Sequence, residues 1–210
     1  MKKISKSFFK VISLLVLVTL TACDSNEIIQ NNDIKTEDTI LKIGSADSKI
    51  TIKVFSSLTC PHCANFHTSI FEKLKKEYVD KGIVKFEHHS FPLDLAALNA
   101  EIIVRCHLDS NKSFQLLGEI YKKQSQWAVG SDINIINESI KKIGLDSGLD
   151  NNKMDKCLNN ETNQEKILNE RIEAQKKYKI ESTPTIYINK KKYKDKHKYK
   201  QFKKAIEKLL

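Results

Sequence analysis

The chain has 210 residues, which is long enough to bury a full core as one domain, or as one domain with an insertion. Its formal charge of +10 is uneven, because residues 189–210 hold ten lysines and two acids, whereas residues 23–188 hold 22 basic and 24 acidic residues. A basic tail of this kind is usually a solvated helix face, although it can also lie against anionic lipid headgroups. There is no Met-rich or His-rich tract, which argues against a metal-delivery protein.

Residues 1–22 have the pattern of a signal peptide. Four lysines precede the apolar run 11–18, which is too short for a comfortable membrane span. The next residues, Leu20-Thr21-Ala22-Cys23, resemble a bacterial lipobox, which implies lipidation of Cys23 and a membrane anchor. Asp24 resembles the residue that keeps some lipoproteins in the inner membrane. The alternative is a plain secretory peptide with an unmodified Cys23, and in either case export makes nucleic acid an unsuitable partner.

Residues 23–46 are polar and lack a periodic apolar face, which predicts a flexible tether. The folded domain is expected to begin at residue 47. Residues 50–55 are β-branched and aromatic and predict a strand. After a turn, a helix is predicted from apolar residues at helical spacing. These residues are Phe66, Ile70, Phe71, Leu74 and Tyr78.

The turn between this strand and helix holds the sequence Cys60-Pro61-His62-Cys63. Pro61 suits the first helical position, so Cys60 is expected at the N-cap, where free amide groups and the helix dipole favour a thiolate. We therefore expect a lowered pKa and a nucleophilic Cys60, with Cys63 as its resolving partner. His62 adds positive charge beside the thiolate. A favoured reduced form makes the disulfide a strong oxidant.

A structural zinc site is the alternative interpretation of the two cysteines. His67 and the pair Cys106-His107 are further possible ligands, but there is no second Cys-x-x-Cys pair. The spacing and the strand–helix context favour redox chemistry without a metal or another cofactor.

A second strand is predicted over residues 83–91, ending at Pro92. The strand–helix–strand order predicts a parallel pair joined by a right-handed crossover. His88 and His89 are neighbours in this strand, so their side chains point to opposite faces. We expect them at the surface or half-buried, and not as ligands.

Residues 93–179 show no strand pattern and predict an all-helical insertion. Trp127 is expected in its core. Strands return at residues 185–188 and 191–193, and a closing helix is predicted over residues 197–209. Pro184 stands at the entry to the first of these strands, where a cis bond in a tight turn would explain it.

Two cysteines remain, Cys106 and Cys157. Free thiols rarely persist in an oxidising compartment, so we predict a structural disulfide between them. Two buried thiols are the alternative.

The Cys60–Cys63 helix start, Thr183-Pro184 and the order of elements are similar to a thioredoxin fold, formed here by residues 47–92 and 180–210. Pro61-His62, the helical insertion and Phe91-Pro92-Leu93 resemble the DsbA family of bacterial protein-disulfide oxidoreductases. The resemblance implies an exposed nucleophile at Cys60, a buried resolving Cys63 and a cis-Pro184. It also implies that Thr183 and Pro184 offer backbone groups to an extended substrate.

The chain departs from the family pattern at two positions. Val54 stands where better-known members have a buried acid, and Thr183 where they often have valine. The first departure concerns proton handling around Cys63. The second places a hydroxyl where it can contact the Cys60 sulfur.

The function predicted from the sequence is that of a periplasmic thiol oxidant that introduces disulfides through a Cys60–Cys63 pair. The expected substrates are reduced, unfolded exported proteins, and the partner implied for reoxidation is a DsbB-like membrane quinone reductase. We also expect lipid on Cys23 to anchor the protein to the inner membrane. The alternatives are an isomerase or reductase of the same fold, or a metal-binding lipoprotein.

Overall fold

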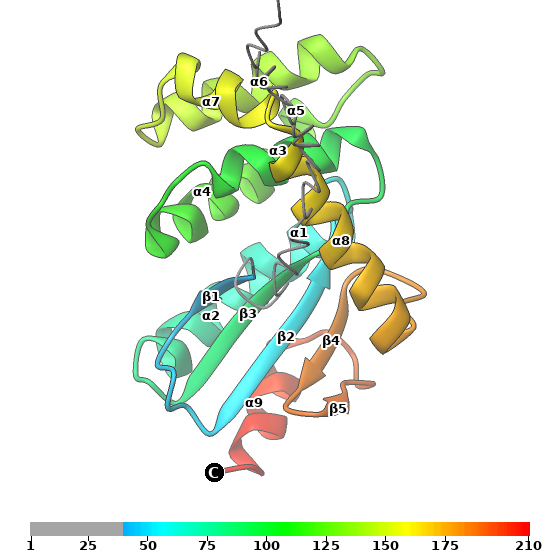
Figure 1. Ribbon diagram of the computed structural model, residues 1–210. Coiled ribbons are helices and arrows are strands. Elements are labelled where there is room, and N and C mark those ends of the chain that lie inside the picture. The colour runs from blue at the N-terminus through cyan, green and yellow to red at the C-terminus, as the bar shows by residue number, and fades with distance from the viewer. Residues whose placement is uncertain (1–39) are drawn as a thin grey trace, which may run out of the picture. The chain divides into compact units, whose positions relative to one another are not determined.

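A five-stranded mixed sheet lies at the centre of residues 40–210, the part of the chain that this computed structural model describes (Figure 1). The order of the strands across the sheet is β1-β3-β2-β4-β5. Their bounds are β1 Leu41–Ile43, β2 Ile50–Ser56, β3 Val84–Ser90, β4 Thr185–Ile188 and β5 Lys191–Lys192.

The central strands β2 and β3 are parallel, with Ile50 opposite Val84 and Ser56 opposite Ser90. This confirms the predicted parallel pair. Strand β4 is antiparallel to β2 and places Thr185 opposite Phe55, so it begins where β2 ends. The carboxyl end of β2 and the entry to β4 therefore meet at the same end of the sheet.

The short edge strand β1 corrects the predicted tether. Residues 41–43 were assigned to a flexible segment that ended at residue 46, but they pair antiparallel with β3, and Leu41 lies opposite His88. A three-residue strand has too little periodicity to be recognised, and the partner that stabilises it lies more than 40 residues away. The predicted signal peptide and Cys23 lie outside the described residues.

The helices follow the predicted pattern closely. The crossover between β2 and β3 is a long helix with two π-helical turns. Its parts are α1 Pro61–Phe66, η2 His67–Phe71, α2 Glu72–Leu74 and η3 Lys75–Val79. The remaining helices are α3 Leu95–Arg105, α4 Ser110–Lys122, α5 Gln124–Trp127, α6 Ile133–Asp146, α7 Asn151–Leu158, α8 Glu161–Tyr178 and α9 Tyr199–Glu207.

Alternation along β2 builds two packed faces. Ile50, Ile52 and Val54 belong to the large core that also holds residues of the crossover helix and of α9. Phe55 points to the other face and packs with Ala174 near the end of α8. Helix α8 runs from the helical layer down to the sheet, so its last turns cover the sheet although residues 93–179 were predicted as an insertion (Figure 1).

The helical layer is organised around α3, which contacts α4, α6, α7 and α8. Trp127 is 1% exposed and its Nε1 donates to the Ile120 carbonyl over 2.8 Å, which places it in the core as predicted. Within residues 40–210, none of the helices combines the length and apolar character that a membrane crossing needs.

His88 and His89 are buried, at 2% and 5% exposure, so the prediction of surface or half-buried residues was wrong. Their side chains do alternate, but helices cover both faces of β3. His88 Nε2 lies 3.0 Å from Glu101 Oε2, and His89 Nε2 lies 3.1 Å from Glu87 Oε2.

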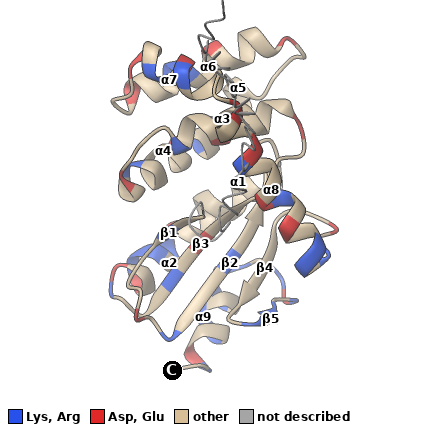
Figure 2. Cartoon of the chain, in the orientation of Figure 1, with Lys and Arg blue, Asp and Glu red and all other residues tan. Residues whose placement is uncertain are grey.

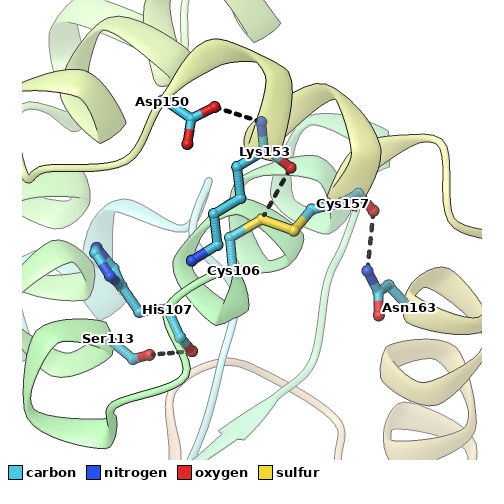
Figure 3. Close-up of a disulfide and its surroundings, with 7 residues drawn as sticks. All are labelled: Cys106, His107, Ser113, Asp150, Lys153, Cys157 and Asn163. Atoms are coloured by element: carbon cyan, nitrogen blue, oxygen red, sulfur yellow. Dashed lines mark hydrogen bonds between the residues drawn. A yellow bond between two sulfur atoms is a disulfide. The ribbon is translucent and has the colours of Figure 1, made fainter.

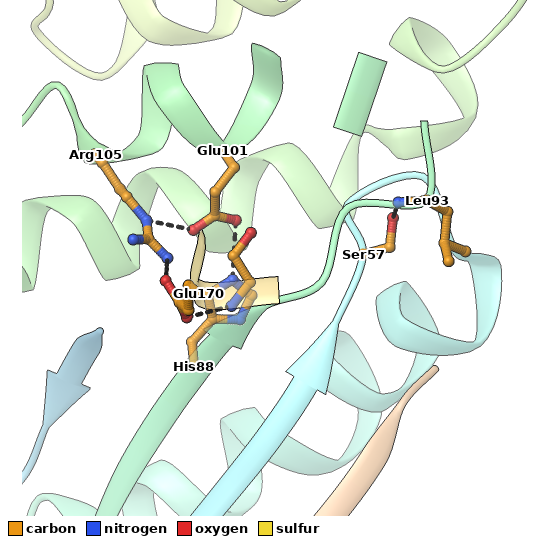
Figure 4. Close-up of polar contacts among 7 residues, drawn as sticks. Ser57, His88, Leu93, Glu101, Arg105 and Glu170 are labelled. Atoms are coloured by element: carbon orange, nitrogen blue, oxygen red, sulfur yellow. Dashed lines mark hydrogen bonds and ion pairs between the residues drawn. The ribbon is translucent and has the colours of Figure 1, made fainter. Parts of the chain in front are cut away.

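The His88–Glu101 pair belongs to a buried ionic network that joins β3, α3 and α8 (Figure 4). Arg105 donates to Glu101 and to Glu170, each over 2.8 Å, and Glu170 also accepts from the Ser90 backbone over 2.7 Å. Burial opposes ionisation of Glu101, but the charges of His88 and Arg105 outweigh it and lower its pKa to about 2. The network fixes the helical layer to the end of β3 that lies beside the cysteine turn.

Cys106 and Cys157 form a disulfide that joins the end of α3 to α7 (Figure 3). Their Cα atoms are 6.1 Å apart, within the range that a disulfide needs. Next to the bond, Asn163 donates to the Cys157 carbonyl over 3.1 Å and so connects α7 to the start of α8.

Candidate active site

Cys60 is the N-cap of α1 and Pro61 is the first helical residue. A turn in which the Cys60 amide donates to the Ser57 carbonyl over 3.2 Å brings the chain from β2 into the helix. The Cys60 carbonyl accepts from the amides of Cys63 and Ala64, at 3.0 and 3.1 Å. Cys60 has extended backbone angles, as an N-cap requires, so its side chain lies beside the free amides of the first turn.

These surroundings lower the pKa of Cys60 from 9.0 to about 5. The largest cause is a hydrogen bond from the Cys63 side chain, and burial opposes it. The Thr183 side chain and the backbone amides of Cys63 and His62 lower the pKa further. A thiol with this pKa is mostly ionised at neutral pH, which agrees with the lowered pKa predicted from the sequence, although the largest cause is the Cys63 side chain and not the helix N-terminus.

Cys63 is more buried than Cys60, and its pKa is raised where that of Cys60 is lowered. It is 1% exposed, against 7% for Cys60, and burial together with the neighbouring Cys60 raises its pKa well above the ordinary value. Neither cysteine takes part in a disulfide in this structure. Cys60 is less exposed than the sequence led us to expect, but it is the more accessible of the pair.

The peptide bond between Thr183 and Pro184 is cis. This turn enters β4 beside the cysteines, and Cys60 Sγ lies 3.4 Å from the Thr183 carbonyl oxygen. A pocket of about 300 Å³ opens next to it. Its lining residues are His62, Asn65, Phe66, Ser182, Thr183, Pro184 and His197. The cis-proline turn therefore contacts Cys60 and also lines this pocket, although neither cysteine lines it.

Three comparisons bear on this site. A family model described as "Thioredoxin" matches residues 35–208. The chain belongs to the thioredoxin family. It is 32% identical to a putative protein-disulfide oxidoreductase of Rickettsia bellii over 178 residues, which cover 81% of this chain and 67% of the relative. It is 30% identical to disulfide bond formation protein D of Bacillus subtilis over 199 residues, which cover 89% of this chain and 86% of the relative.

The fold has a close structural counterpart as well. The crystal structure of Wolbachia pipientis alpha-DsbA1 superposes with a TM-score of 0.74 at 26% identity, over 81% of this chain and 90% of that one. Together with the two relatives, this identifies the chain as a DsbA-like protein-disulfide oxidoreductase with a thioredoxin fold. The chain spans only 55% to 56% of the length of four further Rickettsia relatives.

Gln124 is a residue of this DsbA-like site that the sequence analysis missed. It lies at the start of α5, in the helical layer, and its Nε2 donates to the carbonyls of Leu58 and Cys60 over 2.6 and 3.1 Å. These bonds hold two carbonyls of the turn that precedes the helix. The sequence holds no sign of this role, because 64 residues separate Gln124 from Cys60.

The same turn is held from a second side. The Thr59 hydroxyl donates to Asp94 over 2.7 Å, and Ser57 accepts from the Leu93 amide over 3.3 Å (Figure 4). Asp94 is also the N-cap of α3, where its side chain accepts from the Ala97 amide. The cysteine turn is therefore fixed by the starts of two helices of the helical layer.

His62 is exposed and lines the pocket together with the cis-proline turn. His197 lines the same pocket, and burial, followed by the charge of His62, lowers its pKa. His197 was expected only as the first residue of the closing helix, yet α9 begins at Tyr199 and leaves His197 in the segment before it.

The residues considered as zinc ligands are not brought together. Cys106 is bonded to Cys157, and His67 is buried in η2 with both ring nitrogens lacking a partner in the described residues. Burial, and then the charge of His88, lower the pKa of His67 to about 3. Across residues 40–210, no three His, Cys, Asp or Glu side chains are placed to hold one metal ion.

Proposed function

We propose that this oxidoreductase works as a thiol oxidant, which introduces disulfide bonds into reduced, unfolded exported proteins through a Cys60–Cys63 disulfide. A substrate thiolate attacks the Cys60 sulfur, and the bond to Cys63 breaks. Cys63 leaves as a thiolate and takes up a proton, which its raised pKa favours. The product of this step is a mixed disulfide between Cys60 and the substrate.

A second thiolate of the substrate then attacks the substrate sulfur of the mixed disulfide. The new substrate disulfide forms, and Cys60 leaves as a thiolate. Two electrons have passed from the substrate to the Cys60–Cys63 pair, which ends reduced. The single observation that carries the proposal is the pKa of about 5 for Cys60, because a thiol of low pKa is a good leaving group and favours the reduced protein.

The turn of Thr183 and Pro184 is proposed as the substrate-binding element. It borders the thiol pair and the pocket, and an extended peptide can pair with its backbone groups as an added strand. Pro61 fixes the start of the helix, and His62 lies on the rim of the pocket, where a positive charge favours an approaching thiolate. Cys106–Cys157 is proposed as a structural bond that takes no part in exchange.

The direction of transfer is tested with two forms of ribonuclease. We expect the oxidised protein to restore the activity of reduced, unfolded ribonuclease stoichiometrically, and to act poorly on scrambled ribonuclease. The Cys60→Ser variant abolishes both reactions, because it removes the attacked sulfur. Efficient rearrangement of scrambled ribonuclease, with weak oxidation of the reduced form, would instead assign the protein as an isomerase or reductase.

We propose that the protein acts in the periplasm, anchored to the inner membrane by lipid on Cys23 after removal of residues 1–22. The sequence Leu20-Thr21-Ala22-Cys23 supports this proposal. Labelled fatty acid should be incorporated by the native protein and not by a Cys23→Ala variant. Reoxidation by a DsbB-like quinone reductase is tested by oxygen uptake in membranes that hold this enzyme, with reduced protein as the electron donor.

A further inference from the structure

A group of lysines lies along the edge of the sheet formed by β5 and beside α9. A hollow of about 1060 Å³ opens there between β5 and α9. Its lysines are Lys190, Lys191, Lys192, Lys194, Lys200, Lys204 and Lys208. We call these seven residues the lysine surface. Asp195 is the one acid in the lining.

None of the seven lysines has an ion-pair partner within residues 40–210. Lysine ion pairs do form elsewhere in this range, and in α9 itself Lys203 pairs with Glu77 and Glu207. All but Lys192 are exposed, and Lys192 is half-buried. Figure 2 shows this concentration of positive charge along β5 and the segment that follows it. Seven neighbouring ammonium groups repel one another, so a negatively charged partner is favoured at this surface.

Two exposed leucines adjoin the lysine surface. Leu209 lines the hollow and is 48% exposed, and Leu210 is 72% exposed. Lysines beside exposed apolar side chains suit a phospholipid surface, where the ammonium groups meet the headgroups and the leucines reach the acyl boundary.

The chemistry of the lining is less suitable for other anions. The lining contains no arginine, so it lacks the bidentate fork with which proteins bind single carboxylates or phosphates. Its one aromatic side chain, Tyr193, is stacked on Phe202 with ring centroids 4.2 Å apart, so it is not free to stack on a nucleotide base. Point charges spread over a broad surface match a charged bilayer better than one small ligand.

We propose that the lysine surface docks on bilayers that contain anionic phospholipid. This contact goes beyond the proposed redox function and does not depend on lipidation of Cys23. Strand β4 begins at the cysteine end of β2 and ends at Ile188, opposite Ile52, so the turn that holds Lys190 and Lys191 lies at the end of the sheet away from Cys60 (Figure 1). A docked molecule therefore directs Cys60 away from the membrane, toward substrates in solution.

The test measures binding of the full chain to vesicles of phosphatidylcholine, with and without about a third of phosphatidylglycerol. The surface variant is Lys190→Gln, Lys194→Gln and Lys204→Gln combined. The matched control carries Lys112→Gln, Lys142→Gln and Lys156→Gln, three exposed lysines of the helical layer without an ion pair within residues 40–210. Both variants lose the same charge and keep residues 1–39, so the comparison isolates the lysine surface.

We expect the surface variant to bind anionic vesicles about a hundredfold more weakly than the native chain at low salt, at about fivefold for each lysine. The control should bind within about threefold of the native chain, and all three proteins should oxidise reduced ribonuclease equally. Equal losses of vesicle binding in the surface variant and the control would overturn the proposal, and so would binding that is independent of phosphatidylglycerol. Tighter binding to an oligonucleotide or a polyglutamate, with the same loss in the surface variant, would assign the surface to that polyanion instead.

The orientation is tested separately with a membrane-impermeant maleimide. Alkylation of Cys60 should proceed at the same rate with and without anionic vesicles, because its end of the sheet stays in water. A rate that falls when the protein binds the vesicles would overturn the proposed orientation.

Discussion

The thiolate of Cys60 depends most on its neighbour, Cys63. The pKa of Cys60 falls from 9.0 to about 5, and four interactions lower it against the opposing effect of burial. Together the four must therefore lower the pKa by more than the net change of about four. The largest of the four, the hydrogen bond from the Cys63 side chain, accounts for more than a quarter of that sum. We expect Cys63→Ala to raise the pKa of Cys60 to about 6 or above.

Cys63→Ser is the matched control, since its hydroxyl is of similar size and still donates a hydrogen bond. Its Cys60 should keep a pKa near that of the native protein. The assay is the ultraviolet absorbance of the thiolate in reduced protein, recorded against pH. Equal pKa values in the alanine and serine variants would show that the backbone amides and Thr183 alone hold the thiolate, and would refute the reasoning.

Three further predictions concern pH and the elements that hold the site. Because the pKa of Cys60 is lower in the folded than in the unfolded protein, ionisation of Cys60 stabilises the reduced form. This stabilisation is complete above pH 9, shrinks as the pH falls and vanishes below about pH 5. At pH 7 it is at most ~2.7 kcal/mol, and solvent screening reduces it. The stabilisation is measured by denaturing the reduced and the oxidised protein at pH 5 and at pH 7. Gln124→Leu should destabilise the fold by about 1–3 kcal/mol and slow alkylation of Cys60, because two carbonyls lose a donor. Arg105→Met should cost about 3–5 kcal/mol in urea denaturation, because Glu101 and Glu170 lose their shared cation.

Each of these outcomes has a control. A difference between the two redox forms that stays constant from pH 5 to pH 7 would contradict the assignment of the thiolate to Cys60. For Gln124, unchanged alkylation together with lost stability would limit its role to packing. The control for Arg105→Met is Lys156→Met, at an exposed helix position, which should change stability by less than about 0.5 kcal/mol. A loss of stability equal to that of Arg105→Met would show that the buried network is not its cause.

The features predicted correctly from the sequence follow from neighbouring residues, from the order of elements or from side-chain chemistry. The N-cap at Cys60 and the first-turn position of Pro61 depend only on residues adjacent to each other, and the parallel pairing of β2 and β3 follows from the order of elements. The Cys106–Cys157 bond was inferred from compartment chemistry, and the structure has this bond. The N-cap is thus decided by neighbouring residues, the strand pair by the order of elements, and the disulfide by side-chain chemistry.

The features that were missed depend on partners distant in the sequence. Strand β1 has three residues and gains its hydrogen bonds from β3. His88 and His89 were expected near the surface because strand alternation gives only the direction of each side chain. It does not show that the crossover helix and α8 pack on β3, or that Glu101 of α3 reaches His88. Side-chain periodicity gives the direction of a residue relative to its own strand, and burial is decided by what packs over it.

The contacts of the cysteine turn assign the helical layer a direct part in the site. Gln124 of α5 and Asp94 at the start of α3 hold the turn itself, while Arg105 and Glu170 fix the end of β3 beside it. A low thiolate pKa requires the free amides of α1 to stay aligned with one sulfur, and a loose turn would let them separate. A thioredoxin-fold domain without residues 93–179 would keep the cysteines, the proline and the strand order, yet lose the donors that set the turn. The insertion therefore helps to hold the turn that presents Cys60.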